Sequence, residues 1–217
     1  MSDKYNRSYH LPWSPGGTSD DKRMSDVSGL INTEIVITEK VDGGNACFTS
    51  SNVYARTHSV APSEYWWDAC KALHANVRFE IDPELSVFGE NVWAVHSIEY
   101  DNLPSTFLIF NVRNDSINLW WEWDLVELMS SHLNIPTVPV LFRGTVKSEE
   151  ELKTVTESLA NLPSAFGGMR EGVVVRVARE FKDDEFSTCL AKWVRHNHVQ
   201  TDEHWTKHVR PQRSFRK

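Results

Sequence analysis

The chain has 217 residues, of which 40% are hydrophobic and 24% charged, a composition typical of one soluble folded domain with a short appendage. Its net charge of −7 argues against a protein that is basic over its whole surface and coats nucleic acid. No apolar run approaches the roughly 20 residues that span a membrane, and the polar N-terminus lacks the apolar centre of a signal peptide. The three cysteines are scattered without metal-ligand spacing. We therefore expect a cytoplasmic protein that does not enter a membrane.

Composition divides the chain into three parts. Residues 1–30 are rich in glycine, proline, serine and aspartate, which predicts an extended, turn-rich lead-in packed on the domain. Residues 31–200 carry the strand and helix patterns of the domain itself. Residues 201–217 are predicted to form a short helical, basic tail. Because five basic and no acidic residues follow from His204 onward, this tail is either a solvated end or an arm that contacts a phosphate backbone.

The domain is predicted to begin with strand, tight turn and strand over residues 34–48. The first strand is β-branched, and Gly43 and Gly44 allow the backbone to turn sharply. A short helix follows Pro62, with Ser63 as its expected N-cap.

Later segments repeat strands with helices between them. One helix is expected over residues 121–132, and another begins at a capping box that pairs Ser148 with Glu151 and stops before Pro163. Helices placed between several runs of strands indicate an α+β domain built on antiparallel sheets. The further strands are predicted at 85–95, 107–112, 138–142, 172–178 and 190–194.

Four charged residues lie at strand ends or inside runs that otherwise look buried. Lys40 ends a β-branched strand, Glu90 follows an apolar run, Glu171 precedes a run of valines, and Lys192 lies inside an apolar strand. Burying a charge costs stability unless the charge is paired or functional. Lys40 alone would be an ordinary lysine at a hairpin, but together the four residues indicate one site.

The motifs around these residues resemble, in order and over most of the chain, those of the covalent nucleotidyltransferases, the superfamily of ligases and capping enzymes. The resemblance implies a nucleotidyltransferase (ATP-grasp-like) domain of antiparallel sheets flanked by helices. The matching segments are Lys40-Val41-Asp42-Gly43 (motif I), Arg56 within 55–59 (motif Ia), Phe88-Gly89-Glu90 (motif III), 107–112 (motif IIIa), 171–176 (motif IV) and 190–193 (motif V).

The resemblance implies a role for each matched residue. Lys40 becomes adenylylated by ATP, Asp42 acts in the later steps, and Lys192 stabilises charge on the phosphoryl oxygens. Glu171 is expected to hold Mg²⁺ or Mn²⁺, directly or through water. Arg56 and Glu90 are expected to contact the ribose, and Phe110 is expected to stack on the adenine. The other expected nucleotide-binding residues are Glu39, Glu171 and Lys192. Candidate contacts to phosphate or RNA are Asn45, Arg176, Arg195, Lys207 and Arg210.

Two features of the lysines carry further expectations. A lysine attacks phosphorus only as the neutral amine, so we expect burial, Lys192 and a bound metal ion to lower the pKa of Lys40. Many relatives have a second motif V lysine where this chain has Val194. Either Arg195 replaces that lysine or the contact is absent.

Length favours the RNA ligase branch. DNA ligases and capping enzymes of the superfamily carry a C-terminal OB domain, and the 25 residues after Lys192 are too few to form one. Segments 10–16 and 194–205 also resemble parts of RNA ligases. The resemblance thus implies an enzyme of RNA repair that joins 3′-hydroxyl and 5′-phosphate ends through a lysyl-AMP intermediate and an adenylylated 5′ end.

Its partners would be ATP and RNA, or a nicked duplex that contains RNA, and a partner subunit could supply end recognition. Two alternatives stay open at this point: a GTP-dependent capping-type nucleotidyltransferase, and a non-catalytic RNA-binding or repair-scaffold protein.

Overall fold

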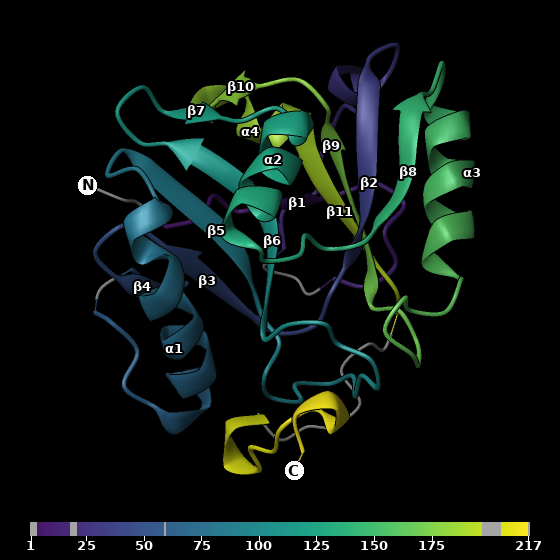
Figure 1. Cartoon of the computed structure of the whole chain (residues 1–217). Coiled ribbons are helices and arrows are strands. Elements are labelled where there is room, and N and C mark those ends of the chain that lie inside the picture. The colour runs from purple at the N-terminus through teal and green to yellow at the C-terminus, as the bar shows by residue number, and fades with distance from the viewer. Residues whose placement is uncertain (1–3, 18–20, 59, 197–204, 217) are drawn as a thin grey trace.

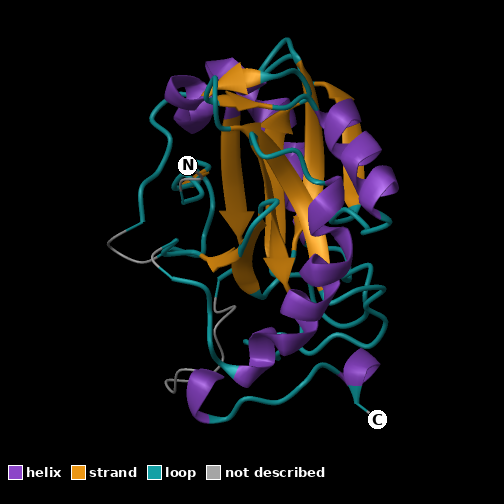
Figure 2. Cartoon of the chain, turned by 60° about the vertical axis from the view of Figure 1, so that its left-hand side comes forward, coloured by secondary structure: helices purple, strands orange, loops and turns teal. Residues whose placement is uncertain are grey.

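The computed structural model describes residues 4–17, 21–58, 60–196 and 205–216. Its strands form two sheets at the centre of the domain (Figure 1). Most helices lie on the outside of these sheets (Figure 2). Since helices lie between strands that pair mainly in antiparallel fashion, the structure confirms the predicted α+β class.

The first sheet has five strands in the order β1-β11-β9-β2-β8. β2 pairs antiparallel with both β8 and β9, and β9 pairs antiparallel with β11. β1 joins β11 in parallel, so the N-terminal segment extends this sheet. The strands are β1 (Tyr9–His10), β2 (Glu34–Lys40), β8 (Val140–Thr145), β9 (Gly172–Val177) and β11 (Leu190–Val194).

The second sheet has six strands in the order β10-β7-β6-β5-β3-β4, all in antiparallel pairs. Its longest pairing joins β5 to β6. The strands are β3 (Gly44–Phe48), β4 (Val53–Ala55), β5 (Leu85–Asn91), β6 (Phe107–Asn114), β7 (Leu119–Trp120) and β10 (Phe181–Lys182).

Four α-helices accompany these strands, and none in the described part of the chain is both long and apolar enough to cross a membrane. They are α1 (Asp68–Val77), α2 (Trp123–Leu133), α3 (Glu149–Ala160) and α4 (Phe186–Cys189). Short 3-10 turns occur at η1 (Ser28–Leu30), η2 (Tyr65–Trp67), η3 (Arg78–Glu80), η4 (Asp183–Glu185), η5 (Trp205–Lys207) and η6 (Arg213–Phe215).

The alternation of side chains along β2 divides the core in two. Ile35 and Ile37 pack in the cluster that also holds Leu152 of α3, whereas Val36 packs in the cluster beneath the second sheet. β2 is therefore buried on both faces, and only its ends carry polar side chains towards a site. The side chain of Lys40 stands at one of these ends.

Several predicted element ends need correction. α1 begins at Asp68 after the turn η2, so Ser63 is not its N-cap. β5 stops at Asn91, earlier than predicted, because the Asn91 side chain accepts a hydrogen bond from the backbone of Trp93 and starts a turn. Of the two hydrogen bonds in the predicted capping box of α3, one is present as predicted. Ser148 accepts from the Glu151 amide at 3.1 Å, but the Glu151 carboxylate accepts from the amide of Lys147.

The predicted turn at residues 41–43 joins two sheets rather than two strands of a hairpin. β2 belongs to the first sheet and β3 to the second. Gly43 does not take a left-handed conformation; it is needed because a Cβ there would lie 2.5 Å from the carbonyl oxygen of Asn91. This close approach lets the chain pass from Lys40 into β3 directly alongside β5.

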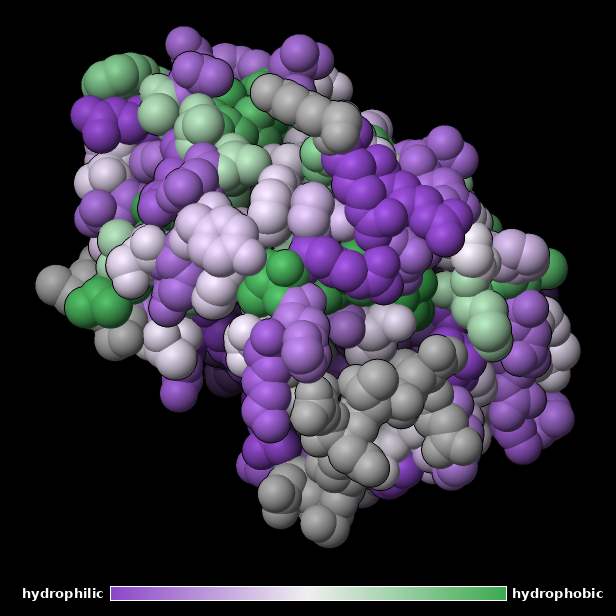
Figure 3. All heavy atoms as spheres, turned by 90° about the horizontal axis from the view of Figure 1, so that it is seen from below, coloured by the Kyte–Doolittle hydropathy of each residue, from purple (hydrophilic) through white to green (hydrophobic). Residues whose placement is uncertain are grey.

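Residues 205–216 form the described part of the predicted tail, and the expectations for residues 197–204 lie outside the described residues. Gln212 is fully buried. Its Nε2 donates to the carbonyl of Ile98 at 3.0 Å, and its Oε1 accepts from the amide of Tyr100 at 2.7 Å. Seen from below, the surface near this segment is mainly hydrophilic, with hydrophobic residues in small separate groups (Figure 3).

Candidate active site

Residues from both sheets meet where β2 ends and β9 begins. The Nζ of Lys40 lies 2.7 Å from Oε2 of Glu171, the residue that immediately precedes β9. The pairing of Lys40 with Gly172 across β2 and β9 fixes this contact. The Glu171 side chain is 5% exposed and that of Lys40 is 26% exposed, so the lysine alone of this pair is open to a ligand.

The strand register of the first sheet brings Lys192 to the same face of the sheet as Lys40. Thr38, Val174, Lys192 and His10 are neighbours across four strands, so their side chains leave the same face of the sheet. Lys40 follows Thr38 by two residues and shares that face. Sheet geometry thus brings together two lysines that lie 152 positions apart in the sequence.

Carboxylates dominate the electrostatics around Lys40. Burial alone would lower its pKa, but Glu171, Glu90 and Asp42 favour the charged amine and raise the pKa above the ordinary value. The expectation of a lowered pKa is therefore wrong for this structure, because sequence spacing does not reveal how many carboxylates pack around a lysine. Burial also raises the pKa of Glu171, and it raises that of Glu90 to about 8.

Lys192 differs from Lys40 in its surroundings. Burial, and then the charge of Lys40, lower the pKa of Lys192, and the Arg56 guanidinium lowers it further. Arg56 itself is exposed. Motifs I, Ia and V therefore contribute three cations to one region.

Asp42 is held by a loop that follows β5. Its Oδ2 accepts hydrogen bonds from the amides of Ser97 (2.6 Å) and Ile98 (2.7 Å), and its own amide donates to the Tyr100 hydroxyl at 2.9 Å. Two amide donors hold the Asp42 carboxylate in one orientation. Sequence reasoning did not find Ser97, Ile98 or Tyr100, because backbone donors leave no residue-type signal.

Glu90, Asn45 and Phe110 come from the second sheet. Asn45 and Glu90 are cross-strand partners of β3 and β5, so their side chains lie side by side. Within the described residues, the buried Oδ1 of Asn45 has no hydrogen-bond partner. Phe110 is half-buried on β6, and the ring of Tyr5 meets it edge-on at a centroid distance of 5.1 Å. Oδ1 of Asn45 is therefore able to accept a hydrogen bond from a hydroxyl or amine of a ligand.

Two expected site residues turn away from a ligand. The Glu39 side chain lies on the opposite face of β2 from Lys40, where it is bound by Ser164, the Ala165 amide and Arg170. The Arg176 guanidinium is buried and donates to Asn111 at 2.6 Å and to main-chain carbonyls. The expected side-chain roles of Glu39 at the nucleotide and of Arg176 at RNA stay predictions, and protein groups already bind both side chains.

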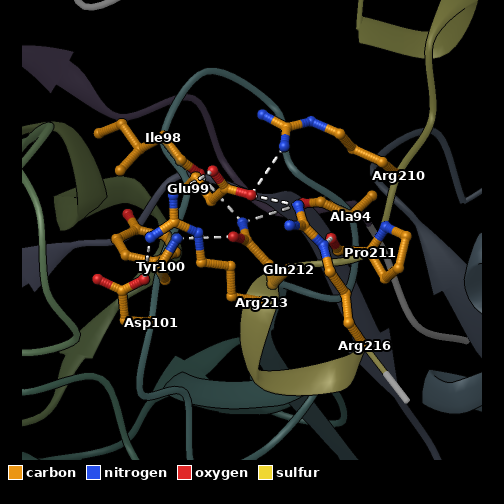
Figure 4. A network of polar contacts seen from close by, with 10 residues as sticks. All are labelled: Ala94, Ile98, Glu99, Tyr100, Asp101, Arg210, Pro211, Gln212, Arg213 and Arg216. Atoms are coloured by element: carbon orange, nitrogen blue, oxygen red, sulfur yellow. Dashed lines mark hydrogen bonds and ion pairs between the residues drawn. The ribbon is translucent and has the colours of Figure 1, made fainter.

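The remaining candidates for RNA contact lie outside this group. Arg195 donates from Nε to the carbonyl of Arg170 at 3.1 Å, and Val194 is buried and apolar. Arg210 forms an ion pair with Glu99 at 2.7 Å, in a network that includes Arg213 and Arg216 (Figure 4). Lys207 is exposed on η5.

No group of three or more potential metal ligands occurs among the described His, Cys, Asp and Glu side chains. Glu171, Glu90 and the amide-bound Asp42 all act on Lys40, but they do not form such a group. Mg²⁺ commonly keeps several waters and is held by one or two carboxylates plus substrate phosphates. The carboxylates present fit an ion that is shared with a nucleotide rather than one held by protein ligands alone.

Comparisons with known proteins agree on one family. A model of the RNA ligase family matches residues 33–194. No curated protein sequence matches the chain closely enough to serve as a relative.

Solved structures of the Naegleria gruberi RNA ligase have a similar fold. An apo mutant gives a TM-score of 0.62 at 13% identity, over 91% of this chain and 57% of that chain. A mutant with ATP and Mn gives 0.61 at 14% identity, over 92% and 58%. The enzyme with PPi gives 0.60 at 15% identity, over 92% and 63%.

At these identities the likeness shows the fold alone, and this chain spans about three fifths of the length of those structures. The family itself is shown by the sequence match, which covers most of the chain from before β2 to the end of β11. The chain belongs to the RNA ligase family.

Proposed function

We propose that this protein is an ATP-dependent RNA ligase that becomes adenylylated on Lys40. One observation carries the proposal: Lys40 is the partly open amine of a group that contains Glu171, Glu90, Asp42 and Lys192, drawn from both sheets. The amine of Lys40 is thus held in place by a protein carboxylate instead of extending freely into solvent. Membership of the RNA ligase family supports ligation as the reaction. The structure of a Naegleria RNA ligase mutant with ATP and Mn supports ATP as the nucleotide.

In the first step the Lys40 amine attacks the α-phosphorus of ATP. An N–P bond forms, the bond to the β-phosphate oxygen breaks, and pyrophosphate leaves. Lys40 must first lose a proton, and Glu171 Oε2, at 2.7 Å, is the acceptor in direct contact. Lys192, on the same face of the sheet, is placed to stabilise charge on the phosphoryl oxygens.

The nucleotide would lie between the two sheets of an ATP-grasp-like domain. Phe110 would stack on the adenine, and Glu90 and Arg56 would contact the ribose. Asn45 lies beside Glu90 and offers its unsatisfied Oδ1 to the same ligand. Glu171 would hold Mg²⁺ or Mn²⁺, directly or through water, and the ion would supply positive charge at the phosphates.

Two transfers complete the reaction. A 5′-phosphate of RNA displaces the lysine from AMP, and a 3′-hydroxyl then displaces AMP, so that a phosphodiester forms. Asp42 is fixed beside Lys40 by two amides, which suits a group that acts in these later steps. Lys207 and Arg195 are retained as candidate RNA contacts, whereas Arg210, which pairs with Glu99 at 2.7 Å, is not.

The chain organisation follows from the same proposal. Residues 31–200 would form the nucleotidyltransferase domain, residues 1–30 a lead-in packed on it, and residues 201–217 a short helical, basic tail. End recognition would come from RNA contacts of this domain or from a partner subunit.

The direct test is incubation with α-labelled ATP and Mg²⁺ or Mn²⁺. The wild-type chain should acquire label and Lys40→Ala should not. Lys147→Ala, an exposed lysine, serves as the matched control and should label normally. Labelled GTP in a parallel reaction separates adenylylation from capping-type chemistry, and wild-type protein that never labels, or Lys40→Ala that labels fully, would contradict the proposal.

A further inference from the structure

An aspartate from the N-terminal segment lies among three cationic or donor side chains beside motif V. Asp21 is 3.6 Å from Nζ of Lys192, 3.6 Å from Nε2 of His10 and 3.8 Å from Nη2 of Arg7. These are ion-pair distances, but each exceeds the length of a normal hydrogen bond. The three side chains therefore converge on the Asp21 carboxylate.

His10 is the most informative member of this cluster. Its side chain is 2% exposed, and within the described part of the chain its buried Nε2 has no hydrogen-bond partner. Buried polar atoms are nearly always bonded, so such an atom needs an explanation. The one group that faces it at ion-pair distance is the Asp21 carboxylate.

The orientation of the His10 ring is fixed from its other side. Nδ1 lies 2.9 Å from the hydroxyl of Ser14, which in turn accepts from the amide of Val194 at 2.9 Å. If the hydroxyl donates to Nδ1, Nε2 carries the proton and points a donor at an anion. Burial, and then the charge of Lys192, lower the pKa of His10 to about 4, which keeps the ring neutral.

The segment that carries His10 is built against β11. Gly16 donates to the carbonyl of Val194, and a Cβ on Gly16 would lie 2.3 Å from the carbonyl oxygen of Arg195. Arg23 also stabilises this segment, because its Nη1 donates hydrogen bonds to the carbonyls of Leu11 (3.3 Å) and Ser14 (2.6 Å). His10 is thus held rigidly next to Lys192, as its pairing in the sheet requires.

We propose that His10, Lys192 and Arg7 form a binding subsite for a phosphate group, and that Asp21 occupies this subsite until phosphate displaces it. A tetrahedral phosphate is larger than a carboxylate and carries more charge and more acceptor oxygens, so it can meet donors that Asp21 reaches only at 3.6–3.8 Å. Asp21 is 26% exposed and can swing outward. The inference rests on the proposed function, since it assigns part of the same substrate.

The phosphate could come from two sources that share this chemistry: the pyrophosphate portion of ATP, or the 5′-phosphate of RNA. Direct binding of pyrophosphate to the whole chain, measured by calorimetry without ATP, tests the subsite without requiring catalysis. Asp21→Asn removes the competing charge and should bind pyrophosphate about tenfold more tightly, while His10→Leu should bind about tenfold more weakly.

The controls separate binding from folding. His10→Gln retains a side-chain donor and should recover part of the affinity lost in His10→Leu. His74→Leu removes another buried histidine, bonded to the Thr49 carbonyl at 2.7 Å, and should leave pyrophosphate affinity unchanged. Melting temperatures of all variants show whether any loss reflects unfolding.

A second measurement identifies the source. If the subsite takes the pyrophosphate portion, His10→Leu should slow lysyl-AMP formation and its reversal by pyrophosphate, while sealing of 5′-adenylylated RNA stays normal. If it takes the 5′-phosphate, His10→Leu should slow transfer of AMP to RNA from protein that is already adenylylated. Equal or weaker pyrophosphate affinity in Asp21→Asn, or unchanged affinity in His10→Leu, would overturn the subsite even if Lys40 still labels.

Discussion

At the scale of single residues, the site is a balance of buried charges. Lys40 forms an ion pair with Glu171, and Glu90 and Asp42 add negative charge around it. Removing one partner of a buried pair leaves the other charge uncompensated, which costs more than the pair contributes. The charge on Lys40 therefore depends on Glu171, and in the proposed mechanism Lys40 would react after passing a proton to Glu171.

Replacing Glu171 tests that dependence. Glu171→Gln keeps the size of the side chain but loses the proton acceptor and the metal-ligating charge. We expect lysyl-AMP formation to slow by about 100-fold or more, measured as the rate of label transfer from ATP. Glu149→Gln, in the exposed first turn of α3, is the matched control. A normal rate in Glu171→Gln would show that the proton leaves Lys40 by another route.

Buried histidines predict how stability depends on pH. Burial lowers the pKa of His74, and burial with Lys192 lowers that of His10 to about 4, whereas an unfolded histidine titrates near 6.5. Below about pH 6.5 the unfolded chain thus binds more protons than the folded chain, so stability is full above this value and falls as the pH drops towards 4. We expect the free energy of unfolding, measured in urea, to fall less steeply with decreasing pH in His74→Gln than in the wild type. Identical slopes would contradict the assignment.

At the scale of elements, the C-terminal segment supports motif I from a distance. Gln212 bonds to Ile98 and Tyr100 in the loop after β5 (Figure 4). The Ile98 amide and the Tyr100 hydroxyl in turn bond to Asp42. The three arginines around Gln212 pair with Glu99 and Asp101 in the same loop. Segments 205–216 and 93–101 therefore act as one unit that sets the position of Asp42.

Gln212 is the buried centre of that unit. Gln212→Leu would leave the Tyr100 amide and the Ile98 carbonyl without partners, at a cost of about 1–3 kcal/mol for each buried group. We expect the free energy of unfolding, measured in urea, to fall by about 3 kcal/mol in total. Arg213→Gln removes two surface ion pairs, with Glu99 and Asp101, and should change the free energy of unfolding by less than about 1 kcal/mol. Equal effects of the two changes would contradict a central role for Gln212.

The sequence predicted individual elements better than their partners. β-branched runs and capping residues located β2, β9, β11 and α3, because these patterns reflect local backbone preference. Strand partners depend on contacts between distant segments, so the transfer from β2 to a second sheet and the addition of β1 to β11 were not predicted.

The same limit applies to the site. The sequence indicated that Lys40, Glu171 and Lys192 belong together, and sheet register brings them to one region. It did not predict that Arg176 is enclosed, that Glu39 faces the other way, or that carboxylates outweigh cations around Lys40. Each of these depends on which side chains pack together across sheets, and residue spacing carries no record of that.

At the scale of the whole molecule, net charge limits how the protein can hold RNA. The chain carries −7, and three arginines of the C-terminal segment are engaged with Glu99 and Asp101. Under the proposed function, an RNA backbone would therefore be held by a few local cations such as Arg195 and Lys207.

Salt dependence measures the number of those cations. We expect the logarithm of the RNA binding constant to fall with the logarithm of salt concentration at a slope of only about −2 to −4, as for a small number of phosphate contacts. Lys207→Gln, at an exposed candidate RNA contact, should reduce the magnitude of the slope by about 1. Arg210→Gln should leave the slope unchanged, because Glu99 already binds Arg210. A much steeper slope, or one that depends on Arg210, would indicate a basic arm on RNA.

The most direct test of the account is the location of the adenylyl group. Wild-type protein incubated with ATP and Mn²⁺, then analysed by mass spectrometry of the intact chain and its peptides, should carry one adenylyl group on Lys40. Lys40→Arg, which keeps the positive charge beside Glu171, should carry none. An unmodified wild-type chain, or a group attached to Lys192 or any other lysine, would contradict the assignment of Lys40 as the nucleophile.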